Sequence, residues 1–487
     1  MTGYTALTKA KDGTMVPLCN GSFLHSQYNP MREAEQFAAQ FDDASFFVVL
    51  GIGGGYHIAA LLRRFPTATV IAVEATEDDL QFISAVPCVQ HLLQDSRVHV
   101  TTAERCAPLL KMCFRPAEHE RFQFCVLRAW ERCMGEKAQQ AAQAVQEALA
   151  EISADFSVQS HFGKLWQRNI LENLALVAHA SSYVPAPSLS TEKTAAIIAA
   201  GPSLDDSIEI LSSHRDHYCV IATDTAYPAL LRRGIVADAA VSVDAQLVSY
   251  EHFFSIRPQT LFVLDLCANP ALVRAVARSG APFTCVETGH PLAQLAACYD
   301  GALHFPHLAT GSGTVTIAAA ALAAHAGFST LALFGADFAY SRGKPYTKGC
   351  YLDPRFLSRG TRIASTEQRF CALMYRTELT ATGNGNTTTL LQSYRRTLRQ
   401  FLCEADFKQD GNVYCRPQQQ KARESVASFD CAAFRRVLAT ADDETLRTLL
   451  LPYIAYLKAH DGRARSFKEN YSLALSKTFV YTKSYEH

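Results

Sequence analysis

Apolar runs alternate with amphipathic segments along most of the chain, which is the pattern of alternating strands and helices. Near the N-terminus, the apolar run Phe46–Leu50 leads through a glycine turn into an amphipathic segment that ends at Phe65. A second apolar run follows at Thr69–Ala75. This order predicts a strand, a turn, a helix and another strand, so we expect residues 1–135 to form an N-terminal Rossmann-like domain.

A second alternating region begins at Thr194 and extends to about Cys415. Its apolar runs are almost free of polar positions, as in parallel sheets that helices cover on both faces. We therefore expect an α/β fold with two Rossmann-like parallel-sheet domains and a helical C-terminal region. The predicted strands of the second region are TAAIIAAG (194–201), YCVIATD (218–224), AAVSVD (239–244), TLFVLDL (260–266), FTCVE (283–287) and TLALFGAD (330–337).

The remaining stretches have helical periodicity. Residues 136–193 are nearly free of Gly and Pro until the Pro- and Ser-rich segment 181–193, which is typical of a linker. A chain of 487 residues is too long for one ordinary core. The predicted domains are an N-terminal domain (1–135), a helical connector and linker (136–193), a central domain (194–415) and a C-terminal helical region (416–487).

Composition and charge exclude several classes of protein. The hydrophobic share of 48% excludes disorder, and the balance of 46 basic against 46 acidic residues argues against a nucleic-acid partner. Ile317–Ala326 is the longest apolar candidate, but it is too short for a membrane span and predicts a buried helix. No signal-peptide stretch begins the chain, so we expect a cytoplasmic protein without a membrane partner.

The fifteen cysteines form neither a CxxC pair nor a cluster at zinc-ligand spacing. We interpret them as small hydrophobic residues and expect no metal site.

The glycine turn after Leu50 resembles a nucleotide-binding turn, with Gly51, Gly53 and Gly55 before a helix and Glu74 at the end of the next strand. Its spacing is closer to methyltransferases than to NAD enzymes, yet no motif for a methyl acceptor follows. The same turn also serves simply to join a strand to a helix, and we favour this scaffold interpretation.

The segment Gly201-Pro202-Ser203-Leu204-Asp205 joins the first strand of the central domain to a helix. Gly201 allows close approach of a ligand, Pro202 stiffens the loop, and Ser203 with the helix N-terminus offers donors to a phosphate. Asp205 also suits the first turn of a helix without any ligand.

Further polar and small residues follow other predicted strands or begin the Ala-rich helix. Because ligands bind outside the carboxyl ends of strands in open α/β sheets, these positions predict a nucleotide crevice. The residues are Asp224, Thr225, Asp244, Thr310, Gly311, Ser312, Gly313, Thr314, Gly335, Asp337 and Tyr340.

The order GPSLD, ATDTAYPALLRRGIVADAAVSVDAQ, TGSGT and GADFAY resembles the motility-associated factor family. These bacterial flagellin glycosyltransferases have a central domain related to the archaeal 6-hydroxymethylpterin diphosphokinase. HSQYNPMREAE (25–35) and GIGGGYH resemble the N-terminal region of that family. The resemblance covers most of the chain and weakens after residue 420.

The resemblance implies transfer of a nonulosonic acid, such as pseudaminic or legionaminic acid, from its CMP-activated form to Ser or Thr of flagellin, in flagellar assembly and motility. The central domain is also similar to bacterial sialyltransferases. That likeness implies that Gly201–Asp205 and Asp224 hold the phosphate and ribose of CMP. It further implies that Thr310, Ser312 and Gly313 bind the donor, and that Asp337 lies near the cytidine or the sugar.

Such a transfer requires stabilisation of the departing phosphate and a group that accepts the hydroxyl proton. Tyr340 and Tyr346 are candidate donors to the phosphate, although Tyr340 is offset by one residue from the related sialyltransferases. The histidine that family members often carry after this strand is absent, which leaves Asp244 and Asp337 as candidate bases. No cofactor or metal is implied beyond the CMP-sugar itself.

Residues 341–400 hold eleven Lys or Arg against three acidic residues. They predict either a solvated basic face or an electrostatic funnel for an anionic donor.

Two other functions remain open. A pterin pyrophosphokinase would use ATP and magnesium held by Asp224, Asp244 and Asp337. A non-enzymatic adaptor would bind flagellin through the helical tail. The oligomeric state stays open as well.

Overall fold

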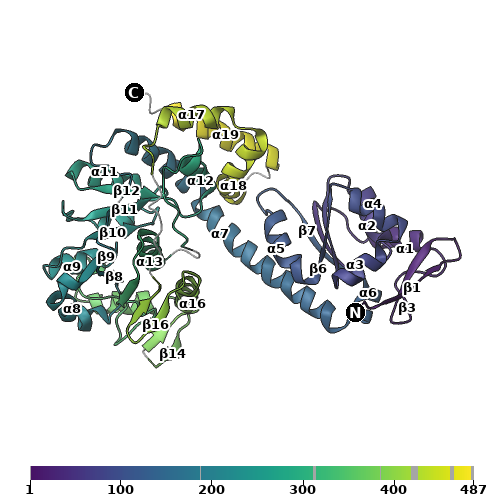
Figure 1. The fold of residues 1–487 in the computed structure, drawn as a ribbon, viewed down its shortest axis with the longest axis horizontal. Coiled ribbons are helices and arrows are strands. Elements are labelled where there is room, and N and C mark those ends of the chain that lie inside the picture. The colour runs from purple at the N-terminus through teal and green to yellow at the C-terminus, as the bar shows by residue number, and fades with distance from the viewer. Residues whose placement is uncertain are drawn as a thin grey trace. The chain divides into compact units, whose positions relative to one another are not determined.

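The computed structural model describes residues 2–186, 188–310, 314–383, 385–417, 426–460 and 465–483. The chain divides into two compact units, each built from two stretches: Met1–Gly163 with Leu451–Ala474, and Lys164–Leu450 with Leu475–His487. Helix α7 (Glu136–His179) continues from the first unit into the second. The segment 136–193, predicted as a connector, therefore contributes residues to both units (Figure 1).

The first unit contains a four-stranded parallel sheet in the order β6-β5-β4-β7. All five residues of β4 are buried, as are Val70–Glu74 of β5, because helices cover the sheet. This arrangement confirms the predicted Rossmann-like sheet. The strands are β4 (Phe46–Leu50), β5 (Thr69–Glu74), β6 (Val98–Thr102) and β7 (Phe122–Val126), and a small antiparallel sheet precedes them with β1 (Tyr4–Lys9), β2 (Met15–Cys19) and β3 (Ser22–Phe23).

Local sequence signals begin several helices of this unit. The Asn29 side chain accepts a hydrogen bond from the Arg32 amide at the start of α1, and Thr76 caps α3 in the same way. The helices are α1 (Pro30–Ala38), α2 (Tyr56–Arg64), α3 (Glu77–Ile83), α4 (Pro87–Gln94), α5 (Ala103–Cys113) and α6 (Arg128–Met134).

The second unit is built on an eight-stranded sheet in the order β12-β11-β10-β9-β8-β13-β17-β16. The first six strands of this order are parallel, and β17 and β16 add an antiparallel edge beside β13. The predicted α/β class is therefore confirmed for both sheets. The strands are β8 (Thr194–Ile198), β9 (Tyr218–Thr223), β10 (Ala239–Ser242), β11 (Leu261–Asp265), β12 (Phe283–Val286), β13 (Thr330–Phe334), β16 (Lys408–Asp410) and β17 (Val413–Cys415).

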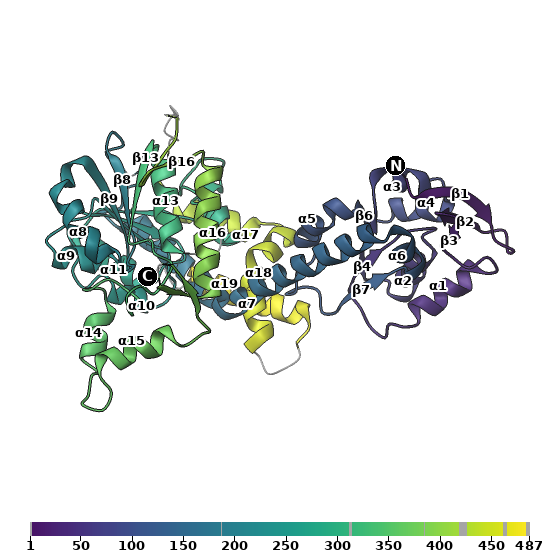
Figure 2. The ribbon, with the colours of Figure 1, turned by 90° about the horizontal axis from the view of Figure 1, so that it is seen from below.

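Helices cover both faces of this sheet, and the side chains of each strand alternate between them. Ala196 and Ile198 of β8 belong to the core beneath α8, α9, α11 and α12, whereas Ala195 and Ile197 belong to the core beneath α13 and α16. These helices are α8 (Leu204–Ser213), α9 (Tyr227–Arg232), α11 (Pro270–Ser279), α12 (Pro291–Cys298), α13 (Val315–Ala326) and α16 (Thr389–Glu404) (Figure 2).

Helix α13 is the Ala-rich segment predicted to be buried, and every residue from Thr316 to Ala323 is buried. Its small side chains allow it to contact β8, β9, β10 and α16 closely. Over the part of the chain that the structure describes, no helix has the length and apolar character needed to cross a membrane.

The remaining elements of the chain lie in connections and in the C-terminal region. In the described part of residues 416–487, the predicted helical C-terminal region is confirmed by α17 (Cys431–Thr440), α18 (Asp443–His460) and α19 (Phe467–Lys483). The connections contain α10 (Val248–Glu251), α14 (Leu352–Leu357), α15 (Thr366–Met374), β14 (Thr380–Thr382) and β15 (Gly385–Thr387), together with a short 3₁₀ helix at Arg215–His217.

Candidate functional site

The strand order of the second unit places a topological switch point between β8 and β13. From β8 the chain builds the sheet outward through β9 to β12, and β13 then returns to the other side of β8. Ligands of open α/β sheets bind where the order reverses in this way, beyond the carboxyl ends of the strands. The segment Gly201–Asp205 follows β8 and Gly335–Asp337 follows β13, so two of the predicted motifs meet at this point.

Gly201 is required by the loop that follows β13. A Cβ atom at this position would lie 2.2 Å from Asp337 Oδ2 and 2.4 Å from the Gly335 carbonyl oxygen. The Gly201 amide donates to that carbonyl at 2.8 Å. From the sequence we expected a ligand to approach the Gly201 backbone closely. In the structure, the groups that approach it closely are Asp337 and Gly335 of the loop after β13.

Asp337 closes the N-terminus of α8. Its Oδ2 accepts a hydrogen bond from the Ser203 amide at 2.8 Å, in the place where a helix N-terminus attracts negative charge. Arg395 of α16 donates to the Asp337 carbonyl oxygen, and Phe338 next to it has a φ of 48°. This positive φ at a bulky residue is strained backbone, which is common at functional sites.

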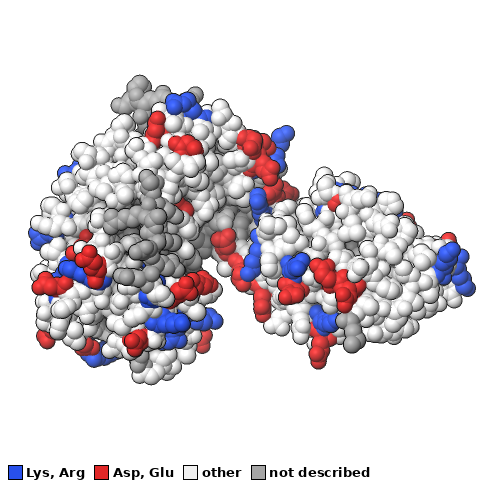
Figure 3. Space-filling model, viewed as in Figure 1, with Lys and Arg blue, Asp and Glu red and all other residues white. Residues whose placement is uncertain are grey.

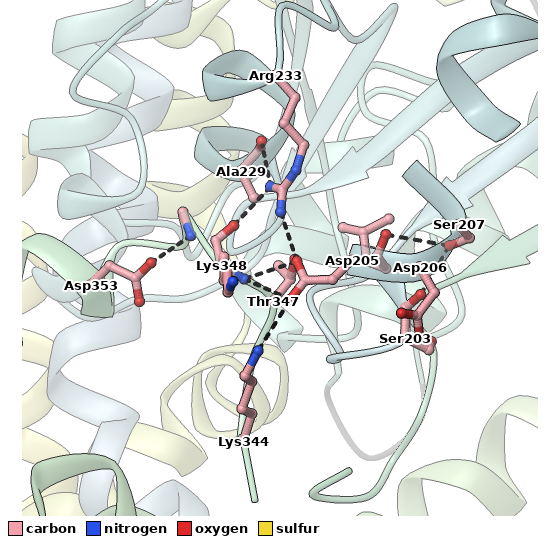
Figure 4. A network of polar contacts seen from close by, with 12 residues as sticks. Ser203, Asp205, Asp206, Ser207, Ala229, Arg233, Lys344, Thr347, Lys348 and Asp353 are labelled. Carbon is pink, nitrogen blue, oxygen red and sulfur yellow. Dashed lines mark hydrogen bonds and ion pairs between the residues drawn. The ribbon is translucent and has the colours of Figure 1, made fainter. Parts of the chain in front are cut away.

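Asp205 connects α8 to the segment after β13, as Figure 4 shows. Its Oδ1 accepts from Arg233 Nη2 at 2.7 Å, from Thr347 Oγ1 at 2.6 Å and from the Lys348 amide at 3.1 Å. Lys344 Nζ lies 3.8 Å from Oδ2. Asp205 therefore has strong partners within the protein and holds the segment that carries Tyr346.

Asp224 is the most enclosed of the predicted strand-end carboxylates, with 1% of its surface exposed. Ser242 Oγ donates to it at 2.9 Å, and the Thr225 amide donates at 2.6 Å. Burial alone would raise the pKa of Asp224, but nearby His252 and these hydrogen bonds hold the pKa below its ordinary value. Asp224 is thus an ionised carboxylate at neutral pH.

Asp244 follows β10 and is partly buried. Its Oδ1 accepts from the Gln246 amide at 2.9 Å. Burial raises the pKa of Asp244, and the charge of Asp224 adds to this rise, while His252 lowers it. A raised pKa makes this carboxylate a stronger base than an ordinary aspartate, so this candidate base retains a physical argument.

Tyr346 interacts electrostatically with Asp224, Tyr340 and Tyr351, which brings both predicted tyrosines to the same side of the sheet. Burial is the main cause that raises the pKa of Tyr346, and burial also raises the pKa of Tyr340. Both phenols therefore remain protonated at neutral pH and are able to donate hydrogen bonds.

The small-residue loop before α13 is described only at its two ends. Thr310 is buried, and Thr314 caps α13 by accepting from the Thr316 amide at 3.3 Å. Gly311, Ser312 and Gly313, predicted to bind the donor, lie outside the described residues.

The basic surplus of residues 341–400 is partly neutralised. Arg342 Nη1 lies 2.8 Å from Asp206 Oδ1, and Arg355 Nη1 lies 3.5 Å from Glu251 Oε2. Figure 3 shows Lys and Arg beside Asp and Glu across the visible face. These pairs reduce the long-range field that the count of charges predicts.

His252 and Tyr351 were missed by the sequence analysis. His252 follows α10, and its Nδ1 lies 3.5 Å from Asp224 Oδ1, while its ring centroid lies 4.2 Å from that of Tyr351. The only signal in the sequence is a histidine among aromatic residues in EHFF, which is more often typical of a core position.

The N-terminal glycine turn is filled by side chains of the first unit. A Cβ at Gly51 would lie 2.5 Å from the Trp130 ring, and the Gly54 amide donates to His25 Nε2 at 2.8 Å. Glu74, the residue expected at a ribose, instead accepts hydrogen bonds from Tyr4 and Trp130. These contacts support the scaffold interpretation of the turn.

Parts of this chain are similar to a described protein family and to uncharacterized proteins of one bacterium. Residues 168–343 match the family described as 6-hydroxymethylpterin diphosphokinase MptE-like. An uncharacterized protein of Treponema pallidum (strain Nichols) is 37% identical over 174 residues, which are 35% of this chain and 81% of that protein. A second uncharacterized protein of the same organism is 35% identical over 151 residues, 30% of this chain and 53% of that protein.

A solved structure extends the comparison to the full chain. It is described as the MAf glycosyltransferase from Magnetospirillum magneticum AMB-1, with a TM-score of 0.53 and 15% sequence identity. The similarity covers 100% of this chain and 87% of that chain, so the two proteins share their fold.

Proposed function

Because the chain belongs to the same family as the first Treponema pallidum relative and carries an MptE-like domain within the fold of a motility-associated factor, we propose that it is a glycosyltransferase. The predicted resemblance to that family is confirmed by the matched domain and the shared fold. The observation that carries the proposal is the group of polar residues at the switch point of the second unit. Asp224, Asp337 and Tyr340 of this group lie within the matched residues 168–343, and Tyr346 lies just beyond them.

The proposed reaction moves a nonulosonic acid from its CMP-activated form to a Ser or Thr hydroxyl of flagellin. CMP leaves from a tertiary carbon, so the site must stabilise the phosphate charge that develops as the bond breaks. Tyr340 and Tyr346, both protonated at neutral pH, supply donors for that charge. Asp224 and the segment Gly201–Asp205 are proposed to position the ribose and phosphate.

The proposed donor carries its own activated leaving group, and we expect protein side chains to neutralise the departing phosphate without a metal or a further cofactor. We expect the protein to act in the cytoplasm, where flagellin is available before export.

A second function follows from the description of the matched family. A pyrophosphokinase acting on a pterin would bind ATP with magnesium, and the carboxylates that follow β9 and β10, Asp224 and Asp244, are the candidates to contact that ion.

Isothermal calorimetry of the full chain separates the two functions. We expect CMP to bind with the same affinity with magnesium and with EDTA, and ATP to bind weakly in both. Magnesium-dependent ATP binding without CMP binding would contradict the glycosyltransferase and support the pyrophosphokinase.

A further inference from the structure

His252 is a buried imidazole without a hydrogen bond. It is 6% exposed, and among the described residues neither ring nitrogen has a hydrogen-bond partner. Its Nδ1 lies 3.5 Å from Asp224 Oδ1, which is an ion-pair distance with geometry unsuited to a hydrogen bond. Buried polar atoms without partners are costly and rare, so this arrangement needs a reason beyond packing.

The carboxylate beside the imidazole is held in place by other groups. Ser242 Oγ fixes one oxygen of Asp224, and the amide and hydroxyl of Thr225 fix the other, at 2.6 and 3.0 Å. An ionised carboxylate held this close to an imidazole stabilises the imidazolium that forms when the ring accepts a proton.

The surroundings of the imidazole place it within the proposed site. Several elements contribute titratable or charged groups around it. The carboxylates of Asp224 and Asp244 come from the ends of β9 and β10. Glu251 of α10 pairs with Arg355 of α14. Tyr351 lies at the start of α14, and Tyr346, which interacts with Asp224 and Tyr351, lies in the segment before it. A proton acceptor and donors for the phosphate therefore occupy one region, as acid–base catalysis of the transfer requires.

We propose that His252 is the general base of the glycosyl transfer and that Asp224 stabilises its imidazolium. This inference rests on the proposed function and names the catalytic group that the sequence did not reveal.

The proposed step moves one proton and one glycosyl group. The acceptor hydroxyl gives its proton to the free imidazole nitrogen, and its oxygen forms a bond to the anomeric carbon of the sugar. The bond from that carbon to the phosphate oxygen breaks, and CMP leaves with the electron pair. The imidazolium then releases its proton to solvent. Both ring nitrogens are shielded from solvent, so the proposed step requires a movement of the side chains that surround the ring, among them Tyr351.

Replacement of His252 by Asn tests the proposal against a matched control, His290→Asn. His290 is also a buried histidine of the second unit with an unpartnered nitrogen, but its Nδ1 accepts from the Leu292 amide at the start of α12. Asn preserves that cap. The readouts are the turnover of sugar transfer to flagellin by intact mass, its pH dependence, the CMP affinity and the melting temperature.

We expect H252N to lower turnover about 100-fold or more, because a positioned base contributes that much. In H252N the rise of turnover with increasing pH should disappear, and the affinity for CMP should stay nearly unchanged. In a separate variant, His252→Ala, added imidazole should restore part of the transfer rate. H290N should transfer at nearly the wild-type rate.

Transfer by H252N within about twofold of wild type, or a slow variant with an unchanged pH profile, would overturn the role of His252 while the proposed function stands. If H252N melts below the assay temperature, His252→Gln replaces it under the same criteria. Wild-type protein that neither binds CMP nor transfers sugar would instead overturn the proposed function, and this inference with it.

Discussion

At the scale of single residues, the tyrosines after β13 provide the sharpest test of how the leaving phosphate is stabilised. Tyr346→Phe removes one hydroxyl and keeps the ring, which belongs to the periphery of the second unit's core. We expect turnover to fall about 100-fold and CMP affinity to change far less, because the phosphate charge develops only in the transition state. Steady-state kinetics of Tyr346→Phe and Tyr340→Phe, measured in parallel, show how much each phenol contributes to turnover.

Tyr375→Phe is the matched control for these variants, because Tyr375 is 66% exposed at the end of α15. Turnover of Tyr340→Phe and Tyr346→Phe equal to that of Tyr375→Phe would show that the two phenols only pack against the sheet.

Asp205 and Asp206 are neighbours whose contacts differ, and this difference predicts different stabilities. Asp205→Asn weakens contacts to Arg233, Thr347 and Lys348, so we expect a loss of about 2 kcal/mol in the free energy of unfolding. Asp206→Asn removes an exposed pair with Arg342 and should change the free energy of unfolding by less than about 0.5 kcal/mol. Urea denaturation measures both, and equal effects would show that the Asp205 contacts contribute nothing special.

At the scale of elements, Gly201 determines how closely the loops after β8 and β13 approach. The Cβ of Gly201→Ala would meet a backbone carbonyl as well as Asp337, so the loops must separate. We expect a loss of at least about 2 kcal/mol in the free energy of unfolding together with weaker CMP binding. Gly383→Ala is the control, because among the described residues no heavy atom outside its chain neighbours lies within 4 Å of its Cβ position. A Gly201→Ala protein as stable as Gly383→Ala would contradict the close approach.

The central strands could be predicted because parallel strands buried on both faces leave nearly continuous apolar runs, as in Thr194–Ile198 and Leu261–Asp265. The short edge strands β16 and β17 could not be predicted, because three residues such as Lys408–Asp410 carry no periodic signal and pair only through the tertiary fold.

The candidate site was predictable where its residues follow a strand directly. Asp224 does so and Asp337 lies three residues after the end of β13, and their positions in the sequence indicated their place at the sheet edge. His252 lies beyond a loop and a short helix, so only the fold brings it to Asp224. Its aromatic neighbours in the sequence favoured a core residue instead.

At the scale of the whole molecule, we expect the stability of the protein to depend on pH through a buried carboxyl group of the first unit. Glu74 lies fully buried in the first unit, and burial raises its pKa to about 7 although Trp130 and Tyr4 donate hydrogen bonds to it. The folded chain therefore binds a proton more tightly than the unfolded chain, and this stabilisation is lost as the pH rises from about 4.5 through 7.

We expect the contribution of Glu74 to the free energy of unfolding to fall by on the order of 3 kcal/mol between pH 5 and pH 8, so the difference between wild type and Glu74→Gln should change by that amount over this range. Chemical denaturation across this pH range measures it. An equal slope in both proteins would assign the pH dependence to other groups. Because the first unit supplies scaffold in our account, Glu74→Gln should bind CMP like the wild type at pH 6.

The proposed transfer of sugar to flagellin is tested most directly by the intact mass of flagellin from a strain that lacks this protein. We expect flagellin to lose the mass of its nonulosonic acid residues, a wild-type copy to restore that mass, and a copy with Asp224→Asn to fail to restore it. A flagellin mass that is unchanged in the absence of the protein would contradict the account.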